Sequence, residues 1–428
     1  MLVAQLLNLL YSIVDRIYIG RIAGIGTLAL GAVGLCFPVI ILITGFTNLY
    51  GMGGSPLFAM ELGRGNRENA AVYQNTAFRL HIVTGVLLMV LGELFCPSIL
   101  RIFGATEIEL QYALPYLRIY LLGTVFSMVS TGMNPFMNAQ GYSTLGMVTV
   151  IIGAVSNLAL DPLFIFGLSM GVSGAAIATV ISQGLSMAFV LWFLYSSQNQ
   201  FRVSFRLAFP KAKEIISLGM ASFIMSITNS LVSITCNSVL MKCGGSIYVS
   251  VMTIVSSVRQ VIDTPVQAIS EGTSPIISYN YGAGKYREVR KAIRMMTVIA
   301  VGYTAVMWVL IMLIPQAFIF IFSSDKTILA SAIPALHMYF FTFVFQALQY
   351  GGQTVFKSLN KKNQAIFFSL FRKVILVVPL TYLLAYAAGR GTDGVFLAEP
   401  VSNLIGGIAC YVTMLLLVYR KLDQKNPK

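Results

Sequence analysis

Two similar stretches decide how this sequence is interpreted: SPLFAMELGRGNRE at residues 55–68 and SPIISYNYGAGKYRE at residues 274–288. They lie 219 residues apart, and residues 55–126 placed on residues 274–345 at that offset share 16 identities over 72 positions without a gap. Apolar composition alone would give roughly six identities, so the sequence predicts two copies of one structural unit.

The composition is that of a membrane protein. Hydrophobic residues make up 57% of the 428 residues, charged residues only 10%, and the mean hydropathy is +0.80. A helix needs about 20 mainly apolar residues to cross the bilayer core. Twelve such stretches predict an all-α integral membrane protein with transmembrane helices at approximately 2–20, 28–58, 70–97, 111–137, 143–166, 171–195, 215–241, 247–279, 289–320, 331–356, 363–388 and 394–419.

The repeat sets the predicted organisation of these helices. Six spans per copy is an even number, so both copies enter the membrane from the same side and form parallel repeats around a central cleft, as in many secondary transporters. We predict an N-terminal six-helix lobe at 1–195, a cytoplasmic linker at 196–214, and a C-terminal six-helix lobe at 215–428 that ends in a short cytoplasmic tail.

The basic residues predict the orientation. Of the 29 Lys and Arg, 18 lie in even-numbered breaks or in the tail and five in odd-numbered breaks. By the positive-inside rule, the even breaks and both termini are cytoplasmic. The net charge of +14 is thus explained by topology and by attraction to anionic lipid, and no nucleic-acid partner is expected. The Gly-x-Gly of the repeated loops lacks the rest of a phosphate loop and predicts a tight turn.

Ionisable residues inside apolar spans are candidates for function because a charge costs several kcal/mol there, about 2.5 to 3.5 on insertion scales. Asn157 and Asp161 are spaced i, i+4 on one helical face, and Pro162 removes the hydrogen-bond donor of the Leu158 carbonyl between them. These oxygens suit Na⁺, or a proton held on Asp161. No ATP-binding domain is recognised, so an ion gradient is the expected energy source.

Depth adds two residues to this candidate site. At about 1.5 Å per residue, Asp15 lies roughly 8 Å and Asp161 roughly 12 Å below the outer ends of their helices, and Thr179 reaches a similar depth. We therefore predict a Na⁺ or proton coupling site made of Asp15, Asn157, Asp161 and Thr179. The alternative is that the two carboxylates are structural partners of intramembrane arginines, namely Arg16, Arg79 or Arg118.

A second polar stripe lies in the span at 247–279. Arg259, Asp263, Gln267 and Glu271 are spaced by four residues, and their repeat equivalents are neutral. The stripe could line a substrate cleft or relay a proton. The alternative is a helical Arg259–Asp263 ion pair with Glu271 near the cytoplasmic edge. The two histidines show no metal-ligand spacing, and no nucleophile–base motif is present, so neither an enzyme nor a cofactor beyond the coupling ion is predicted.

Five motifs together resemble the MATE family (multidrug and toxic compound extrusion), nearest to its DinF-like and MepA-like bacterial branch. They are the paired loops, YSIVDRIYIGR at 11–21, FMNAQGYS at 136–143, NLALDPLFIFG at 157–167 and GVSGAAIATVISQ at 171–183. The resemblance covers essentially the whole chain. It implies two six-helix lobes in a bacterial cytoplasmic membrane, and it places a cation or proton site at Asp15, Asn157, Asp161 and Thr179.

The leading hypothesis is an antiporter that exports organic cations and drugs in exchange for Na⁺ or H⁺. Its expected partners are small organic cations and membrane lipids, and we expect a monomer. A flippase for lipid-linked or polyanionic glycan precursors is the alternative, which intramembrane arginines such as Arg118 and Arg259 would favour. A receptor or sensor without a transport cycle is a third possibility.

Overall fold

The computed structural model describes residues 7, 14–15, 17–22, 25–103, 105–196, 201, 208–320 and 326–424, and all regular elements in these ranges are helices. The chain divides into two compact units, Val3–Phe223 and Ile224–Lys428. The boundary falls inside α9 (Phe209–Gly244), which begins within the range predicted as a linker. Pro210 lies in the first turn of α9, where proline is well tolerated. The predicted first span, 2–20, lies largely outside the described residues.

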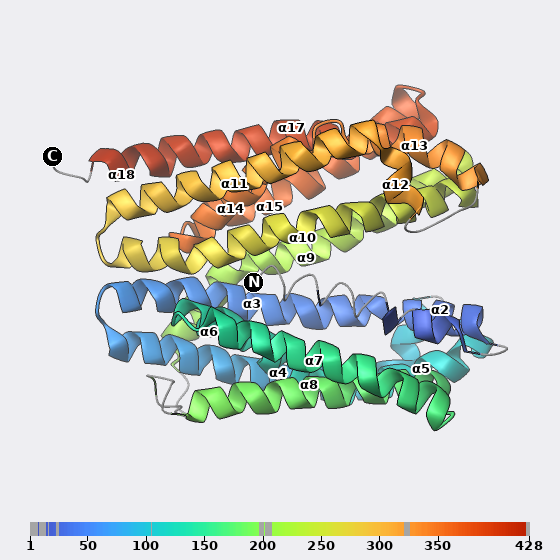
Figure 1. Ribbon diagram of the computed structural model, residues 1–428, viewed down its shortest axis with the longest axis horizontal. Helices are drawn as coiled ribbons and strands as arrows, with labels where there is room; N and C mark the ends of the chain where they lie inside the picture. The colour runs from blue at the N-terminus through green and yellow to red at the C-terminus, as the bar shows by residue number, and fades with distance from the viewer. Residues whose placement is uncertain are drawn as a thin grey trace. The chain divides into compact units, whose positions relative to one another are not determined.

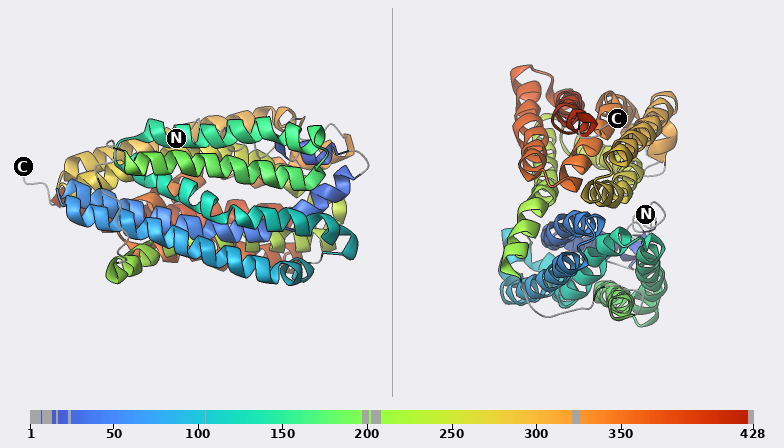
Figure 2. Two further views of the ribbon diagram at one scale, coloured as in Figure 1. Left: turned by 90° about the horizontal axis from the view of Figure 1, so that it is seen from below. Right: turned by 90° about the vertical axis from the view of Figure 1, so that its left-hand side faces the viewer.

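The helices of the first unit are long and run beside one another (Figures 1 and 2). Among them, α3 packs against α4 and α6, and α7 packs against α8. Their bounds are α2 (Gly26–Gly34), α3 (Phe37–Gly63), α4 (Arg67–Ile102), α5 (Glu107–Leu122), α6 (Thr124–Ala139), α7 (Ser143–Pro162), the π-helical turn η1 (Leu163–Gly167) and α8 (Gly171–Tyr195).

The second unit repeats this order. Its helix α10 packs against α11, and α14 packs against α17. The bounds are α10 (Ser246–Gly282), α11 (Tyr286–Leu313), α12 (Pro315–Phe320), α13 (Lys326–Phe340), α14 (Val344–Ser358), α15 (Lys362–Leu370), η2 (Phe371–Val377), α16 (Val378–Tyr382), η3 (Leu383–Ala387), α17 (Gly391–Met414), η4 (Leu415–Tyr419) and α18 (Arg420–Gln424).

Eight helices among the described residues are long and apolar enough to cross a membrane, or ten if each of two bent pairs is one span. The bends are 54° between α5 and α6 and 48° within Leu329–Ser358, at equivalent places in the two units. A further helix, α10, has 37 residues and more than the necessary length, but it carries the charged stripe. The all-α membrane fold is therefore confirmed.

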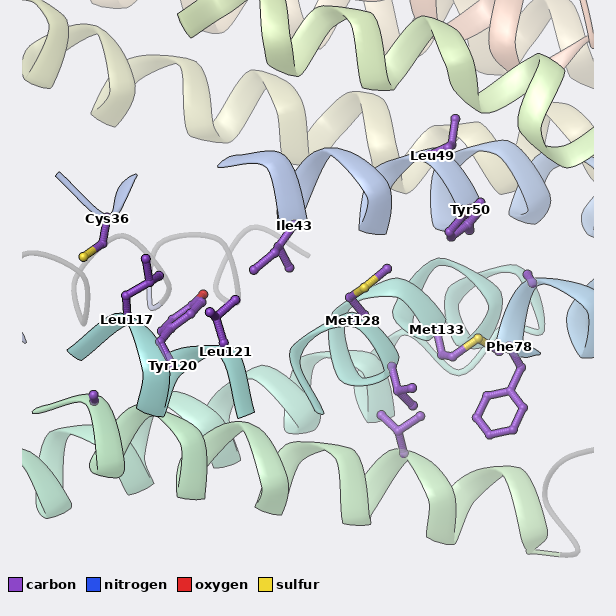
Figure 3. Packing of buried hydrophobic residues seen from close by; sticks show 14 of the residues in the cluster. Cys36, Ile43, Leu49, Tyr50, Phe78, Leu117, Tyr120, Leu121, Met128 and Met133 are labelled. Carbon is purple, nitrogen blue, oxygen red and sulfur yellow. The ribbon is translucent and has the colours of Figure 1, made fainter. Parts of the chain in front are cut away.

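Each unit has its own apolar core. In the first unit Phe58 and Phe136 are completely buried. Leu117 and Met128 are also completely buried, and Figure 3 shows them among other core residues of this unit. A separate cluster fills the second unit, where Phe340, Phe343 and Phe396 are buried. Burying a side chain of this kind stabilises a fold by about 1.5 to 3 kcal/mol relative to exposure to water. Interlocked apolar side chains thus fix the helices that carry the polar residues.

The repeated loops form the same turn. Gly65 and Gly284 have φ of +77° and +73°, a conformation that glycine adopts without a Cβ penalty. In each loop the next amide returns to a carbonyl five residues earlier, Asn66 to Glu61 and Lys285 to Asn280. This is the helix-ending arrangement in which glycine is preferred. The prediction of a tight turn at these glycines is confirmed.

Candidate functional site

Three of the four predicted coupling residues are in hydrogen-bond contact. The Nδ2 of Asn157 in α7 donates to Oδ1 of Asp161 at 3.2 Å and to Oγ1 of Thr179 in α8 at 3.4 Å. Asn157 and Asp161 are 3% and 1% exposed. Because α7 and α8 pack side by side, the amide bridges the two helices. Pro162 ends α7, and the π-helical turn η1 follows it.

Asp15, the fourth predicted residue, belongs to the same electrostatic group. Its carboxylate repels that of Asp161, and both act on the hydroxyl of Tyr116 in α5. Tyr116 is 4% exposed. Its interaction with both carboxylates adds α5 to the elements that contribute to this group. Sequence reasoning missed Tyr116, because no spacing separates it from the other tyrosines of the chain.

The ionic state of Asp161 is the central property of this group. Asp161 makes no ion pair with a described residue, and its Oδ2 is a buried oxygen with no hydrogen-bond partner in the described part of the chain. The Oδ1 of Asn157 is in the same condition. A buried carboxylate is expensive unless a cation or a proton neutralises it. These oxygens therefore fit a coupling ion.

The alternative of structural ion pairs finds no support at Asp161. Arg118 instead pairs with Glu93, with 3.9 Å between Arg118 Nε and Glu93 Oε2, and both side chains are partly exposed. Arg16 lies outside the described residues. No group of three or more His, Cys, Asp and Glu among the described residues could hold a metal ion, so a Na⁺ site would need the amide, hydroxyl and carboxylate oxygens found here.

A polar cavity of about 110 Å³ adjoins Asn157 and Thr179. Asn134, Asn157 and Gln183 line this cavity. Each has a buried side-chain amide oxygen without a hydrogen-bond partner in the described part of the chain. No charged side chain lines it. The lining comes from α6, α7 and α8 and comprises Ser127, Ser130, Thr131, Asn134, Thr149, Val150, Gly153, Ala154, Asn157, Thr179, Ser182, Gln183 and Ser186.

The stripe predicted in α10 is only partly one group. Arg259 Nε donates to Asp263 Oδ2 at 3.1 Å, so the helical ion pair weighed above is present. Gln267 instead donates to Tyr350 of α14 at 3.2 Å. Glu271 interacts electrostatically with Lys357, also in α14. Arg259 and Asp263 thus form one pair, whereas Gln267 and Glu271 each interact with a residue of α14.

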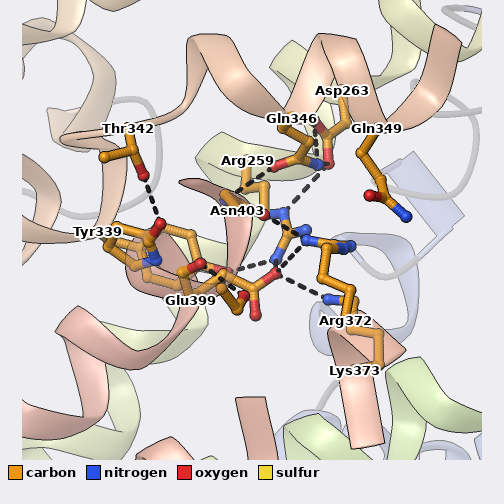
Figure 4. Close-up of polar contacts among 12 residues, drawn as sticks. Arg259, Asp263, Tyr339, Thr342, Gln346, Gln349, Arg372, Lys373, Glu399 and Asn403 are labelled. Atoms are coloured by element: carbon orange, nitrogen blue, oxygen red, sulfur yellow. Dashed lines mark hydrogen bonds and ion pairs between the residues drawn. The ribbon is translucent and has the colours of Figure 1, made fainter. Parts of the chain in front are cut away.

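The sequence did not predict a network of ion pairs around Glu399 in α17 (Figure 4). Its Oε1 lies 2.7 Å from Arg259 Nη1, 3.2 Å from Arg372 Nη1 and 2.8 Å from Lys373 Nζ. Gln346 donates to both oxygens of Asp263, at 3.0 and 2.8 Å.

Sequence reasoning missed Arg372, Lys373 and Glu399. A signal was available, since Glu399–Pro400 repeats the carboxylate–proline order of Asp161–Pro162 inside an apolar span.

A duplicated bundle of apolar helices that holds a buried carboxylate is typical of secondary transporters. The family model described as MatE matches residues 1–163 and 221–383. The chain therefore belongs to the MatE family of transporters. The two matched segments start 221 − 1 = 220 residues apart, so the duplication is confirmed independently.

Curated relatives share this assignment. The chain is 25% identical over 415 residues to a FAD transporter of Shewanella oneidensis, covering 94% of this chain and 89% of that protein. It is 26% identical over 337 residues to the multidrug export protein MepA of Staphylococcus haemolyticus, covering 78% and 73%. MepA of Staphylococcus aureus is 23% identical over 430 residues, 99% of this chain and 92% of that protein.

Solved structures show the same fold. An outward-facing multidrug resistance MATE transporter of the MOP superfamily superimposes with a TM-score of 0.92 at 22% identity, covering 99% of this chain and 94% of that one. A MOP superfamily transporter from Pyrococcus furiosus, described as having a binding pocket of reversed polarity, superimposes with a TM-score of 0.91 at 22% identity, covering 100% and 95%. Identity at this level supports the fold alone.

Proposed function

We propose that this protein is an antiporter that exports organic cations across the bacterial cytoplasmic membrane in exchange for Na⁺ or H⁺. The observation that carries the proposal is the buried carboxylate oxygen of Asp161, which has no hydrogen-bond partner among the described residues and lies beside Asn157 in a MatE-family fold. The multidrug export relatives support drugs as cargo. Both termini are expected on the cytoplasmic side, and a monomer is the expected active form.

In the proposed cycle, the coupling ion binds at Asp161 and neutralises it. Asn157 holds the carboxylate through Nδ2 and offers Oδ1 to the ion, while Thr179 supplies a hydroxyl oxygen. Asp15 adds negative charge nearby, which strengthens attraction for a cation. Coupling requires that the ion and the drug each bind the two conformations of the transporter with different affinity.

An anionic cargo is the competing proposal, because one relative is a FAD transporter. The intramembrane arginines that favoured polyanionic cargo are already engaged in the structure. Arg259 contacts Asp263 and Glu399, and Arg118 faces Glu93. A charge that is paired internally must lose its partner before it binds an anion, which costs free energy. This weighs against a polyanion and in favour of an organic cation.

The test is substrate efflux from proteoliposomes. Ethidium or FAD is loaded inside, and a Na⁺ gradient, a pH gradient or no gradient is imposed in separate experiments. We expect ethidium export that is accelerated by at least one of the two gradients, and no gradient-driven FAD export. Export of FAD without ethidium would overturn the proposal in favour of anionic cargo.

A further inference from the structure

The charged network around Glu399 occupies a particular place in the duplicated fold. At the repeat offsets of 219 and 220 residues, the cavity residues Ser127, Gly153, Ala154, Thr179 and Gln183 of the first unit correspond to Gln346, Arg372, Lys373, Glu399 and Asn403 of the second. The first unit thus has a polar cavity where the second has charged and amide side chains in contact with one another.

One packing contact supports this correspondence in three dimensions. A Cβ on Gly153 would lie 2.7 Å from Ser186 Oγ, and a Cβ on Gly406 would lie 3.0 Å from Cγ of Arg372. Gly153 corresponds to Arg372 and Ser186 to Gly406, so the same two helix positions meet in both units with the large residue on opposite sides. Ser186 thus occupies the space beside Gly153 in the first unit, and the Arg372 side chain occupies the space beside Gly406 in the second.

The charges in this network do not balance. Arg259, Arg372 and Lys373 provide three cations, and Asp263 and Glu399 provide two carboxylates. The five side chains are between 4% and 15% exposed. An excess charge at such a buried position is costly, because little water is present to screen it. The network reaches neutrality when one cation gives up a proton.

Of the three cations in the network, lysine is the one that can lose a proton. Arginine stays protonated in proteins, whereas a buried lysine exchanges its proton readily. Lys373 is 3% exposed, and its Nζ lies 2.8 Å from Glu399 Oε1, close enough to share a proton with it. Lys373 and Arg372 also belong to the π-helical segment η2, and π-bulges occur frequently at functional sites.

We infer that Lys373, held against Glu399, is a second proton-binding site of this transporter. The network alternates between a neutral state, with Lys373 unprotonated, and a state of net charge +1 after Lys373 binds a proton. Besides Arg372 of η2, the charged and titratable groups around the pair come from α9, α10 and α13: Cys236, Arg259, Asp263 and Tyr339. Tyr350 of α14 lies one step further out and interacts with Arg259, Asp263 and Arg372. Only the use of this proton for export rests on the proposed function.

The site itself is tested without any substrate, by thermal unfolding of the full-length protein in detergent from roughly pH 6 to 9. The variants are Lys373→Met, which mimics the neutral side chain, and Lys373→Arg, which keeps the charge. In the unfolded chain Lys373 is protonated, so an unprotonated native Lys373 means that unfolding takes up one proton. The folding equilibrium of wild type should then rise with pH relative to both variants, approaching about tenfold per pH unit at the upper end of the range, where native Lys373 is unprotonated.

The control is Lys285→Met, which removes an exposed lysine outside this network. Its difference from wild type should not change with pH. A pH-independent difference between wild type and Lys373→Met, or a Lys373→Arg variant that follows wild type across the range, would overturn the inference. If Lys373→Arg fails to fold, Lys373→Met decides alone.

A transport measurement then separates this inference from the proposed function. Both Lys373 variants should lose at least about tenfold of the ethidium efflux driven by a pH gradient in proteoliposomes. Absence of gradient-driven ethidium efflux in wild type would contradict the proposed function and leave the titration result standing. Normal pH-driven efflux in both variants would overturn a role for the Lys373 proton in transport.

Discussion

At the scale of the residue, the account depends on atoms that lack partners. Asp161 Oδ2 and Asn157 Oδ1 are buried without a hydrogen bond from any described residue. Leaving a buried polar atom unsatisfied costs about 1 to 3 kcal/mol, and more for a charged group. A cation or a proton that binds these oxygens removes this cost. The unsatisfied oxygens therefore contribute to the free energy of ion binding.

Asn157→Ala tests the bridging amide. Its loss removes hydrogen bonds to Asp161 and Thr179 and one candidate ion ligand, and bonds to charged groups are worth about 1.5 to 3 kcal/mol. The half-saturating Na⁺ or proton concentration for ethidium efflux should therefore change by roughly tenfold or more. The control is Ser186→Ala, which alters the same cavity away from Asp161. Equal effects of the two variants would contradict a specific role for Asn157.

Much of this site follows from the sequence. The i, i+4 spacing of Asn157 and Asp161 and the depth of Thr179 are one-dimensional properties, and the contacts they predict are present. Their role in ion coupling stays a prediction. Tyr116 could not be found in the same way. It lies on α5, and the sequence does not show which side of that helix faces Asp161. Glu399 could have been found from its proline and its position in the repeat.

At the scale of the element, the two units share an unusual helix contact. Gly174 of α8 packs on the π-helical turn η1, and Gly394 of α17, its repeat equivalent, packs on η3. An added Cβ would lie 2.7 Å from the Phe164 carbonyl group in one unit and 2.5 Å from the Leu384 carbonyl carbon in the other. Both contacts are with backbone, which cannot move aside as a side chain does.

Gly174→Ala and Gly394→Ala should each destabilise the protein. Overpacking typically costs about 1 to 3 kcal/mol, which corresponds to a fall in Tm of roughly 2 to 10 °C measured in detergent. Gly302→Ala in α11 is the matched control, because an added Cβ there meets nothing within 4 Å. A Tm unchanged by the first two variants would show that the helix contact is looser than described.

Element type was predictable, and element geometry was not. Apolar length predicts helices in the right places, but the single predicted span 111–137 is two helices that meet at 54° beside Gly123. The predicted span 363–388 likewise contains the π-helical segments η2 and η3. Hydropathy reports what a segment buries and carries no information on its local helical turn.

At the scale of the whole molecule, duplication has produced two chemically unequal units. In the first unit Asp161, close to a polar cavity, has no cation partner among the described residues, and in the second unit Glu399 is contacted by three cations. Their helices nonetheless begin and end at equivalent positions, such as Arg67 and Tyr286 after the matched turns. One fold thus carries two different arrangements of charged residues.

The predicted orientation is tested by labelling single introduced cysteines in intact cells. Glu107→Cys lies in an odd-numbered break and should react with a membrane-impermeant maleimide from outside. Lys285→Cys lies in a repeated loop that is predicted to be cytoplasmic, and it should react only after permeabilisation. The background is measured with the Cys243→Ser variant, because Cys243 is only partly buried, whereas Cys36, Cys96, Cys236 and Cys410 are buried. The reverse pattern would invert the topology.

The central claim is that Asp161 couples an ion gradient to export, and Asp161→Asn in proteoliposomes tests it most directly. The variant keeps the size of the side chain and removes its charge. Ethidium efflux under Na⁺ and pH gradients should fall to the rate seen without a gradient, whereas Glu93→Gln, which alters another carboxylate in the membrane, should keep most of the wild-type response. Gradient-driven efflux by Asp161→Asn at the wild-type rate would contradict the account.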